Sequence, residues 1–418
     1  MSPPDTIEYF NSRNLLMPLV TTIEEWVIVV GDPNLYDLVT STLSQVDSHL
    51  KILHTTDPYT LNSLIDNREV DLVICDLGMV SPVENFLESF LEKTPEIPLL
   101  LISRNPEVEE AVEAMRKGAF HVLPAPVDPH ELHRVMVLGL VVAANRRELR
   151  ERKRIMQRDL EMAQHIQLNL LPPREMAIPG GVVVSTRHIP AEILGGDFFD
   201  VTPIDHQHIG IVIADVSGHG VAASLVVVVL KTLLMNAAPF VRTPAMFLEH
   251  LNIQLIKMLP ESYYLTCFYG ILNTTSGELC YANCGHPSPF LLRRDTSVEL
   301  LKSRGFYLGL DPRLDVEEQY ITLHNDDRII LYTDGLIDLR IAENESYGEK
   351  NLVRSLESHR ELPASQMLDR VIDDLRQQTG GRIPEDDIAL MCVEFCSDKV
   401  PKPLESDTAD AIGKMLME

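Results

Sequence analysis

The sequence predicts a multidomain chain: a doubly wound parallel α/β sheet, a long coiled-coil helix, and an α+β domain built as a β-sandwich flanked by helices. The first part is indicated by short β-branched runs that alternate with helical stretches from Trp26 onward. The second is indicated by an unbroken helical pattern over residues 128–171, and the third by many strand-like runs after Gly181. With 418 residues, the chain is too long for one ordinary domain.

The N-terminal part alternates strand-like and helical segments. The apolar runs WVIVV, LKIL, DLVIC, PLLLI and HVL are separated by helical patterns. This alternation is typical of a parallel sheet with helices on both faces, whose ligand sites lie beyond the carboxyl ends of the strands. Asp32, Asp76 and Ser103 occupy those ends. They are therefore the candidate site residues of this domain.

This segment resembles a response-regulator receiver domain. In that resemblance Asp76, in ICDLGM, matches the phosphoacceptor, Asp32 matches an acidic Mg²⁺ ligand, and Ser103 matches the hydroxyl that senses the phosphoryl group. The resemblance implies a bound Mg²⁺ ion and a histidine kinase as a possible partner.

Three positions depart from the receiver pattern. Gly31 stands where a second acidic residue is usual, Ala125 stands where a lysine precedes the proline, and Val122 stands where an aromatic residue is common. Loss of a carboxylate weakens Mg²⁺ binding, and without the lysine no residue evident in the sequence neutralises an acyl phosphate. Two readings stay open: regulated phosphorylation of Asp76, and a receiver-like domain that acts only through protein contacts.

A long helix is predicted to connect the two folded parts. Asp128 can cap its start and Pro129 suits its first turn. Apolar residues recur every seven positions at Val135, Val142, Leu149, Met156, Ala163 and Leu170. The heptad positions between these residues, which would also face a partner helix, are apolar only at the two ends of the helix. This pattern predicts that two parallel helices pair along this seam, with a less stable middle, and hence a homodimer. We interpret the basic run 146–158 as a solvated flank with ion pairs inside the helix, rather than as a nucleic-acid patch.

The C-terminal part carries aspartates beside predicted strands. Asp215 follows an apolar run and precedes a Ser-Gly-His-Gly turn, and Asp197 precedes that run in GGDFFD. Asp334 follows a second strand-like run, and Asp386 precedes a third. Carboxylates fixed at strand ends, with room for water, are the usual ligands of hard divalent cations. A fold that gathers the four aspartates would hold two such ions.

The segments GGDFFD, ADVSGHG, NCGHPSP, YTDG and EDDIAL occur in this order. They resemble motifs of the SpoIIE/RsbU-type branch of the metal-dependent (PPM) serine/threonine protein phosphatases, over residues 171–396. The resemblance implies a PPM-type β-sandwich flanked by helices and two bound Mn²⁺ or Mg²⁺ ions.

The resemblance also implies roles for individual residues. Asp215 would bridge the two ions, and Asp197 would bind one of them together with the backbone carbonyl of Val216. Asp334 and Asp386 would bind the other ion; the family's ligand is the first residue of an acidic pair, which favours Asp386. Two ions can activate a shared water for attack on phosphorus, so no covalent nucleophile is needed.

Two histidines lie in motif turns. His219, beside the bridging aspartate, is read as a structural hydrogen-bonding residue, with a role as general acid as the alternative. His286, in NCGHPSP, is read as a turn residue.

Composition restricts the function classes. The formal net charge of −26 argues against binding to nucleic acids and to anionic membranes. The six cysteines are scattered without a CxxC pair and read as reduced core residues of a cytoplasmic protein. The N-terminal stretch lacks the features of a signal peptide, and the longest apolar run is too short to span a membrane.

The predicted organisation follows from these patterns. The boundaries are an N-terminal tail (1–24), a receiver-like domain (25–130), a signalling helix (131–171), a SpoIIE-type PPM phosphatase domain (172–397) and an acidic tail (398–418). The predicted function is a signalling phosphatase acting on phosphoserine or phosphothreonine. By resemblance, its substrate would be a STAS-type anti-sigma-factor antagonist. The alternative is a non-catalytic adaptor that binds a sigma factor or its anti-sigma partner.

Overall fold

The computed structural model describes the chain in segments: residues 25–43, 50–66, 70–80, 82–104, 108–237, 242–260, 263–294, 298–342, 345–382 and 384–396. Both predicted tails lie outside the described residues. The chain divides into two compact units, 1–156 and 157–418.

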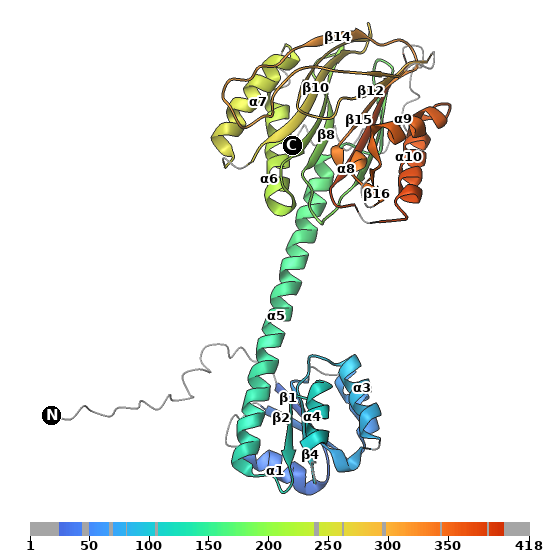
Figure 1. The fold of residues 1–418 in the computed structure, drawn as a ribbon. Helices are drawn as coiled ribbons and strands as arrows, with labels where there is room; N and C mark the ends of the chain where they lie inside the picture. The colour runs from blue at the N-terminus through green and yellow to red at the C-terminus, as the bar shows by residue number, and fades with distance from the viewer. Residues whose placement is uncertain are drawn as a thin grey trace, which may run out of the picture. The chain divides into compact units, whose positions relative to one another are not determined.

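The N-terminal unit contains a parallel sheet of five strands in the order β2-β1-β3-β4-β5 (Figure 1). The strands are β1 (Glu25–Val30), β2 (Leu50–Thr55), β3 (Leu72–Asp76), β4 (Leu99–Ser103) and β5 (His121–Pro124). β3 and β4 are buried along their whole length, as expected for central strands covered on both faces.

Helices cover both faces of this sheet. They are α1 (Pro33–Leu43), α2 (Leu61–Asp66), α3 (Val83–Lys93) and α4 (Val108–Arg116), with 3₁₀ turns at Pro58–Thr60 and Leu77–Met79. Residues of α1 and of the first turns of the long helix form one core cluster, and residues of α2, α3 and α4 form the other. The predicted doubly wound sheet is confirmed.

The long helix α5 (Pro129–Leu170) has 42 residues. Asp128 caps its start, because its side chain accepts a hydrogen bond from a backbone N–H two residues on (2.9 Å). The predicted seam is wrong at its first position, since Val135 is buried in the core of the N-terminal unit. Leu149 and Met156, at later seam positions, are exposed, and pairing with a second copy stays a prediction.

The basic segment of α5 is only partly a solvated flank. Arg152 and Arg154 form ion pairs with glutamates of the same helix, as predicted. Arg147 instead pairs with Asp71, which lies just before β3 in the N-terminal unit. The prediction is wrong for Arg147 because the folded sheet brings an acidic residue to the helix, which local spacing alone does not reveal.

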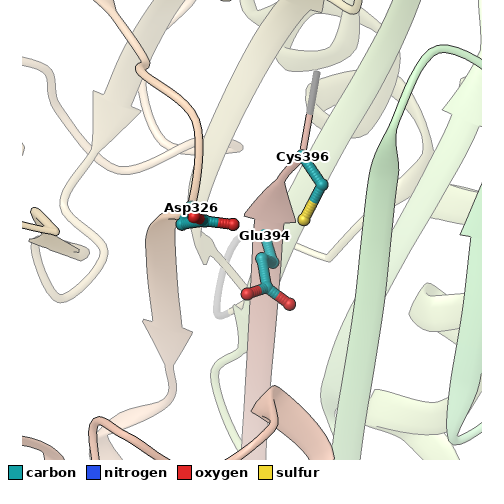
Figure 2. A group of neighbouring side chains, drawn as sticks. All are labelled: Asp326, Glu394 and Cys396. Carbon is teal, nitrogen blue, oxygen red and sulfur yellow. The ribbon is translucent and has the colours of Figure 1, made fainter. Parts of the chain in front are cut away.

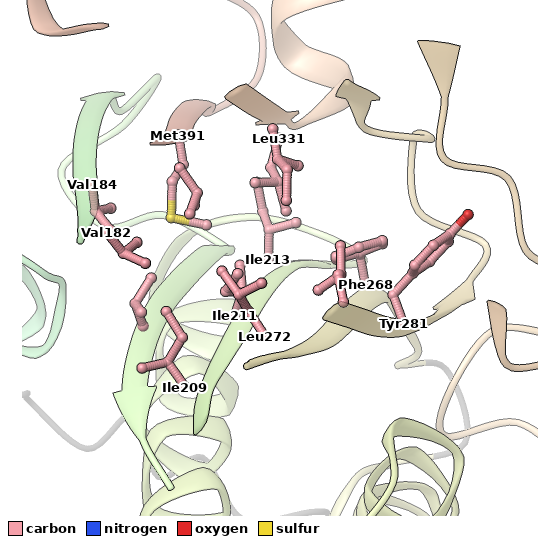
Figure 3. Close-up of a cluster of buried hydrophobic side chains, with 14 of the residues drawn as sticks. Val182, Val184, Ile209, Ile211, Ile213, Phe268, Leu272, Tyr281, Leu331 and Met391 are labelled. Atoms are coloured by element: carbon pink, nitrogen blue, oxygen red, sulfur yellow. The ribbon is translucent and has the colours of Figure 1, made fainter. Parts of the chain in front are cut away.

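The C-terminal unit is a sandwich of two antiparallel sheets. One has the order β14-β11-β10-β9-β8 and the other the order β13-β12-β15-β18-β7-β6. The strands are β6 (Glu175–Ile178), β7 (Val182–Ile189), β8 (Asp197–Pro203), β9 (His208–Val216), β10 (Leu265–Asn273), β11 (Glu278–Cys284), β12 (Phe290–Leu292), β13 (Val298–Leu300), β14 (Gln319–Thr322), β15 (Asp327–Tyr332) and β18 (Ile388–Phe395). Their inward-facing apolar residues form the shared core shown in Figure 3.

Helices flank the sandwich on both sides (Figure 1). α6 (Gly220–Ala237) and α7 (Pro244–Met258) pack on the β8–β11 sheet. α9 (Gly348–Ser358) and α10 (Ala364–Gln378) pack on the sheet that contains β15 and β18. The predicted sandwich is confirmed.

Some short elements were not predicted. They are the one-turn helix α8 (Asp334–Ile337) and the small hairpin of β16 (Arg340–Ala342) and β17 (Glu345–Ser346). Five of the six cysteines are buried, as predicted. In the described part of the chain, every helix is too short or too polar to cross a lipid bilayer.

Candidate metal centre

Two of the predicted ligands face each other across neighbouring strands. Asp197 begins β8 and Asp215 lies near the end of β9, and the antiparallel register places them opposite each other. The backbone N–H of Val216 donates a hydrogen bond to the carbonyl of Gly196 (3.3 Å). Asp197 is only 2% exposed, so a charge on its carboxylate needs a partner inside the protein.

The second sheet brings the other two predicted ligands to the same edge. Asp334 follows β15, and Asp386 precedes β18, the strand paired with β15. The buried hydroxyl of Thr333 connects the two sheets: it donates to Asp197 Oδ2 (2.8 Å) and accepts from the N–H of Ala389 (2.8 Å). Aspartates from distant parts of the sequence therefore converge at one edge of the sandwich.

The electrostatics of this edge are dominated by negative charge. Burial raises the pKa of Asp197, and the charge of Asp215 raises it further. Burial, together with the charges of Asp334 and Asp386, raises the pKa of Asp215 to about 7. The pKa values of Asp334 and Asp386 are also raised, in each case mainly by burial.

Among the described residues, no lysine or arginine forms an ion pair or hydrogen bond with any of these four aspartates. Mutually repelling carboxylates without a protein cation fit divalent metal ions, which prefer oxygen ligands. The residues present are thus suited to the ions that the sequence resemblance implies.

Asp387 has a different environment from Asp386. Its carboxylate accepts hydrogen bonds from the N–H groups of Ala191 (2.8 Å) and Gly196 (2.7 Å). It therefore fixes the loop that leads into Asp197. A Cβ atom at Gly195 would lie 2.3 Å from Asp387 Oδ2, so this approach requires glycine. Since both carboxylate oxygens of Asp387 accept hydrogen bonds from the loop backbone, the geometry favours Asp386 as the metal ligand of the acidic pair.

Gln167, in the last turn of α5, also holds this loop. Its side-chain amide donates to the Gly195 carbonyl (2.7 Å) and accepts from the Gly195 N–H (3.2 Å). Sequence reasoning did not select Gln167 as a site residue. The signal available was its place in DLEMAQHIQLNLLPP, directly before the prolines that end the helix.

Comparison with known families identifies two domains in this chain. Residues 205–396 match the family of stage II sporulation protein E (SpoIIE), and residues 27–136 match the response regulator receiver domain. The chain joins a receiver domain to a SpoIIE-type domain of the PPM phosphatases.

Individual relatives support the same assignment. The chain is 28% identical over 221 residues to "Phosphoserine phosphatase RsbU" of Bacillus subtilis, covering 52% of this chain and 64% of the relative. It is 25% identical over 242 residues to "Phosphoserine phosphatase RsbP" of the same organism, covering 57% and 58%. The chain thus spans less than two thirds of the length of each of these curated relatives.

A solved structure supports the fold of the SpoIIE-type domain. The PP2C domain of SiaA from Pseudomonas aeruginosa superposes with a TM-score of 0.53 at 21% identity, covering 58% of this chain and 98% of that one.

The two histidines of the SpoIIE-type domain differ in environment. His286 is buried, and burial lowers its pKa to about 3, so its ring is neutral. The ring contacts the Thr266 hydroxyl (2.8 Å) and the Tyr332 carbonyl (3.1 Å), which supports a structural role. His219 is exposed and lies 3.0 Å from Glu192, and its role stays a prediction.

A cavity of about 350 Å³ opens beside the aspartates of the SpoIIE-type domain. Asp215, Asp334 and His286 line it together with Tyr264 and Tyr307. A second cavity, of about 670 Å³, lies in the receiver unit against α5 and contains none of the predicted site residues. The smaller cavity therefore provides the space next to the candidate metal centre.

One further group of side chains has metal-ligand composition. Ligand atoms of Asp326, Glu394 and Cys396 lie within 4.8 Å of one another (Figure 2). However, Glu394 pairs with Arg328 (3.1 Å) and Asp326 pairs with Arg294 (3.2 Å). The acidic charges are thus already balanced by protein cations. The four predicted aspartates do not form such a tight group; a site for two ions spreads its ligands over ions about 3.5–4 Å apart.

The three predicted residues of the receiver domain lie at the carboxyl edge of its sheet. Asp76 ends β3 and is 5% exposed, and its Oδ1 accepts from the N–H of Gly78 (2.8 Å). Asp32, after β1, accepts a hydrogen bond at the start of α1 (2.9 Å). Ser103 ends β4. Sequence reasoning missed Arg104, whose guanidinium lies 3.4 Å from Asp76 Oδ2.

Proposed function

We propose that this chain is a signalling protein phosphatase that hydrolyses phosphoserine or phosphothreonine on a regulatory protein, under the control of its receiver domain. The observation that carries the proposal is the convergence of four aspartates with raised pKa values at one edge of the sandwich. A scaffold has no need of buried, mutually repelling carboxylates, because they destabilise the fold when no cation is bound.

In this proposal Asp197, Asp215, the carbonyl of Val216, Asp334 and Asp386 hold two Mn²⁺ or Mg²⁺ ions. When bound, such ions supply a hydroxide at neutral pH and neutralise charge on the phosphoryl group. The chain's own contribution is to fix the ligands before the substrate arrives.

Several contacts provide that fixation. Thr333 orients Asp197 through a hydrogen bond of 2.8 Å. Asp387 and Gln167 hold the backbone on the N-terminal side of Asp197. The cavity beside Asp215 and Asp334 gives the phosphorylated side chain access to the centre.

The decisive experiment is phosphatase activity in Mn²⁺, measured with p-nitrophenyl phosphate and with a phosphoserine protein. The full-length parent should hydrolyse both, and Asp215→Asn should lose the activity. Asp315→Asn is the matched control, because Asp315 is exposed and lies outside the candidate centre. If the parent and both variants are equally inert, the adaptor alternative is favoured.

We further infer that the substrate is a phosphorylated anti-sigma-factor antagonist of the STAS type. The support is the likeness to RsbU and RsbP, both of which are named phosphoserine phosphatases. The metal-depleted chain can bind a substrate without turning it over, so it should enrich such a phosphoprotein in a pull-down. Enrichment of an unphosphorylated sigma factor instead would contradict this assignment.

A further inference from the structure

A guanidinium lies beside two aspartates of the receiver domain. Arg104 Nη2 lies 3.4 Å from Asp76 Oδ2 and 3.7 Å from Asp32 Oδ2. The Arg104 side chain is 67% exposed, whereas that of Asp76 is only 6% exposed. The arginine therefore lies on the solvent side of the buried carboxylate.

Arg104 places a positive charge near the position where Ala125 replaces the lysine of the receiver pattern. β4 pairs with β5 so that Ser103 is opposite Pro124, and the N–H of Ala125 donates to the Ser103 carbonyl (2.8 Å). Arg104, directly after Ser103, thus starts from the strand end next to position 125. The positive charge missing from the end of β5 is present at the end of the neighbouring strand β4.

We propose that Arg104 binds the phosphoryl group carried by Asp76, the residue at the phosphoacceptor position of the receiver resemblance. A planar guanidinium donates paired hydrogen bonds to phosphate oxygens. In the unmodified chain Arg104 contacts Asp76 and Asp32, and after modification it binds the oxygens of the new phosphoryl group. This proposal does not depend on catalysis by the SpoIIE-type domain.

The modification itself is a simple transfer from an acyl phosphate donor. One oxygen of Asp76 attacks the phosphorus, and the bond between phosphorus and the donor's carboxylate oxygen breaks. The donor's carboxylate leaves with the bonding electron pair, so one acyl phosphate is consumed and one is formed without uptake or release of a proton. Arg104 stabilises the negative charge on the phosphoryl oxygens during the transfer.

The test is phosphorylation of the full-length chain by acetyl phosphate, measured as a rate by intact-protein mass spectrometry. All proteins carry Asp215→Asn, so that the SpoIIE-type domain cannot consume the donor. The chain with an intact receiver pocket should be modified, and Asp76→Asn should not. Arg104→Ala should react about tenfold more slowly or worse, because a charge-assisted contact to the phosphoryl group is lost. Arg104→Lys should retain part of the rate.

The double variant Arg104→Ala with Ala125→Lys separates charge from structure. If Arg104 acts by its charge, a lysine at position 125 should restore much of the lost rate. An equal rate in Arg104→Ala and its parent would overturn the proposal, as would a double variant no faster than Arg104→Ala. A chain that is neither modified by acetyl phosphate nor able to bind beryllofluoride would also overturn it.

Discussion

The receiver domain and the SpoIIE-type domain each gather aspartates at a sheet edge, but they balance the charge differently. In the receiver pocket, Arg104 lies within 3.7 Å of both Asp32 and Asp76. In the SpoIIE-type domain, burial and mutual repulsion raise the pKa of Asp215 to about 7, and no described lysine or arginine pairs with it or its three neighbours. Similar acidic clusters can thus differ in whether a positively charged side chain of the protein lies beside them.

The difference has a physical consequence for function. In the receiver pocket a guanidinium places positive charge beside the two carboxylates. Buried carboxylates that repel one another, with no lysine or arginine beside them, are stabilised by protons at low pH or by divalent ions near neutral pH. We therefore expect the stability and activity of the SpoIIE-type domain to depend on metal ions far more than those of the receiver domain.

The largest effect on activity is expected when Asp386 and Asp387 are substituted one at a time. Asp386→Asn removes a proposed ligand and should lower Mn²⁺-dependent activity by more than the roughly 10- to 100-fold typical of residues that only orient ligands. The loss of activity in Asp387→Asn should fall within that range. This variant should also have a free energy of unfolding lower by about 1–3 kcal/mol, because one of two backbone donors loses its acceptor. Activity titrated against Mn²⁺, with thermal unfolding alongside, would distinguish them; a larger loss in Asp387→Asn would reverse the assignment.

A smaller effect on metal dependence is expected from Gln167 of α5, which holds the loop before Asp197. Gln167→Ala removes both hydrogen bonds to Gly195, so the loop before Asp197 is less constrained. The Mn²⁺ concentration for half-maximal activity should rise by about tenfold, in line with losses of residues that orient ligands. Gln157→Ala is the matched control, because this glutamine of the same helix is exposed and donates a hydrogen bond to Glu161 of α5 (3.2 Å). Equal metal dependence in the two variants would show that Gln167 does not position the metal ligands.

The smallest effect is expected in the pH dependence of the metal-free chain. The pKa of Asp215 is raised from 3.8 to about 7 by burial and by neighbouring carboxylates, so between these values the folded state holds a proton that the unfolded state has lost. The contribution of Asp215 to the free energy of unfolding therefore decreases as the pH rises through that range.

Thermal unfolding in a chelator, followed from pH 5 to pH 8, would measure this contribution. The melting temperature of the parent should fall relative to that of Asp215→Asn by a few degrees. Excess Mn²⁺ at the upper pH should reverse the trend in the parent. Parallel curves for the two proteins would show that Asp215 has an ordinary pKa.

Much of the fold was predictable because its signals are local. Alternating apolar runs predicted the parallel sheet, and Asp197, Asp215, Asp334 and Asp386 could be proposed as ligands because each borders a strand within a recognisable motif. The contacts that support the site were not predictable in this way. Asp387 binds the N–H of Gly196, 191 residues away in sequence, and such a contact exists only after the two sheets pack together.

Arg104 is an intermediate case. Its neighbour Ser103 was expected at the carboxyl edge of the sheet, so a search for charged residues directly after the strand ends would have found it. Position 125 is not the only place from which a positive charge can reach Asp76, because a parallel sheet brings the ends of adjacent strands to one place. The cation of a site can therefore come from a neighbouring strand.

The number of divalent ions that the full-length chain binds tests the metal centre most directly. Isothermal titration calorimetry with Mn²⁺ at neutral pH should give saturable binding of two ions in the SpoIIE-type domain. The same titration of Asp215→Asn should lose most of that uptake while the variant remains folded. Absence of saturable Mn²⁺ binding in the folded parent would contradict a catalytic metal centre and would leave these aspartates without the cations that their charges require.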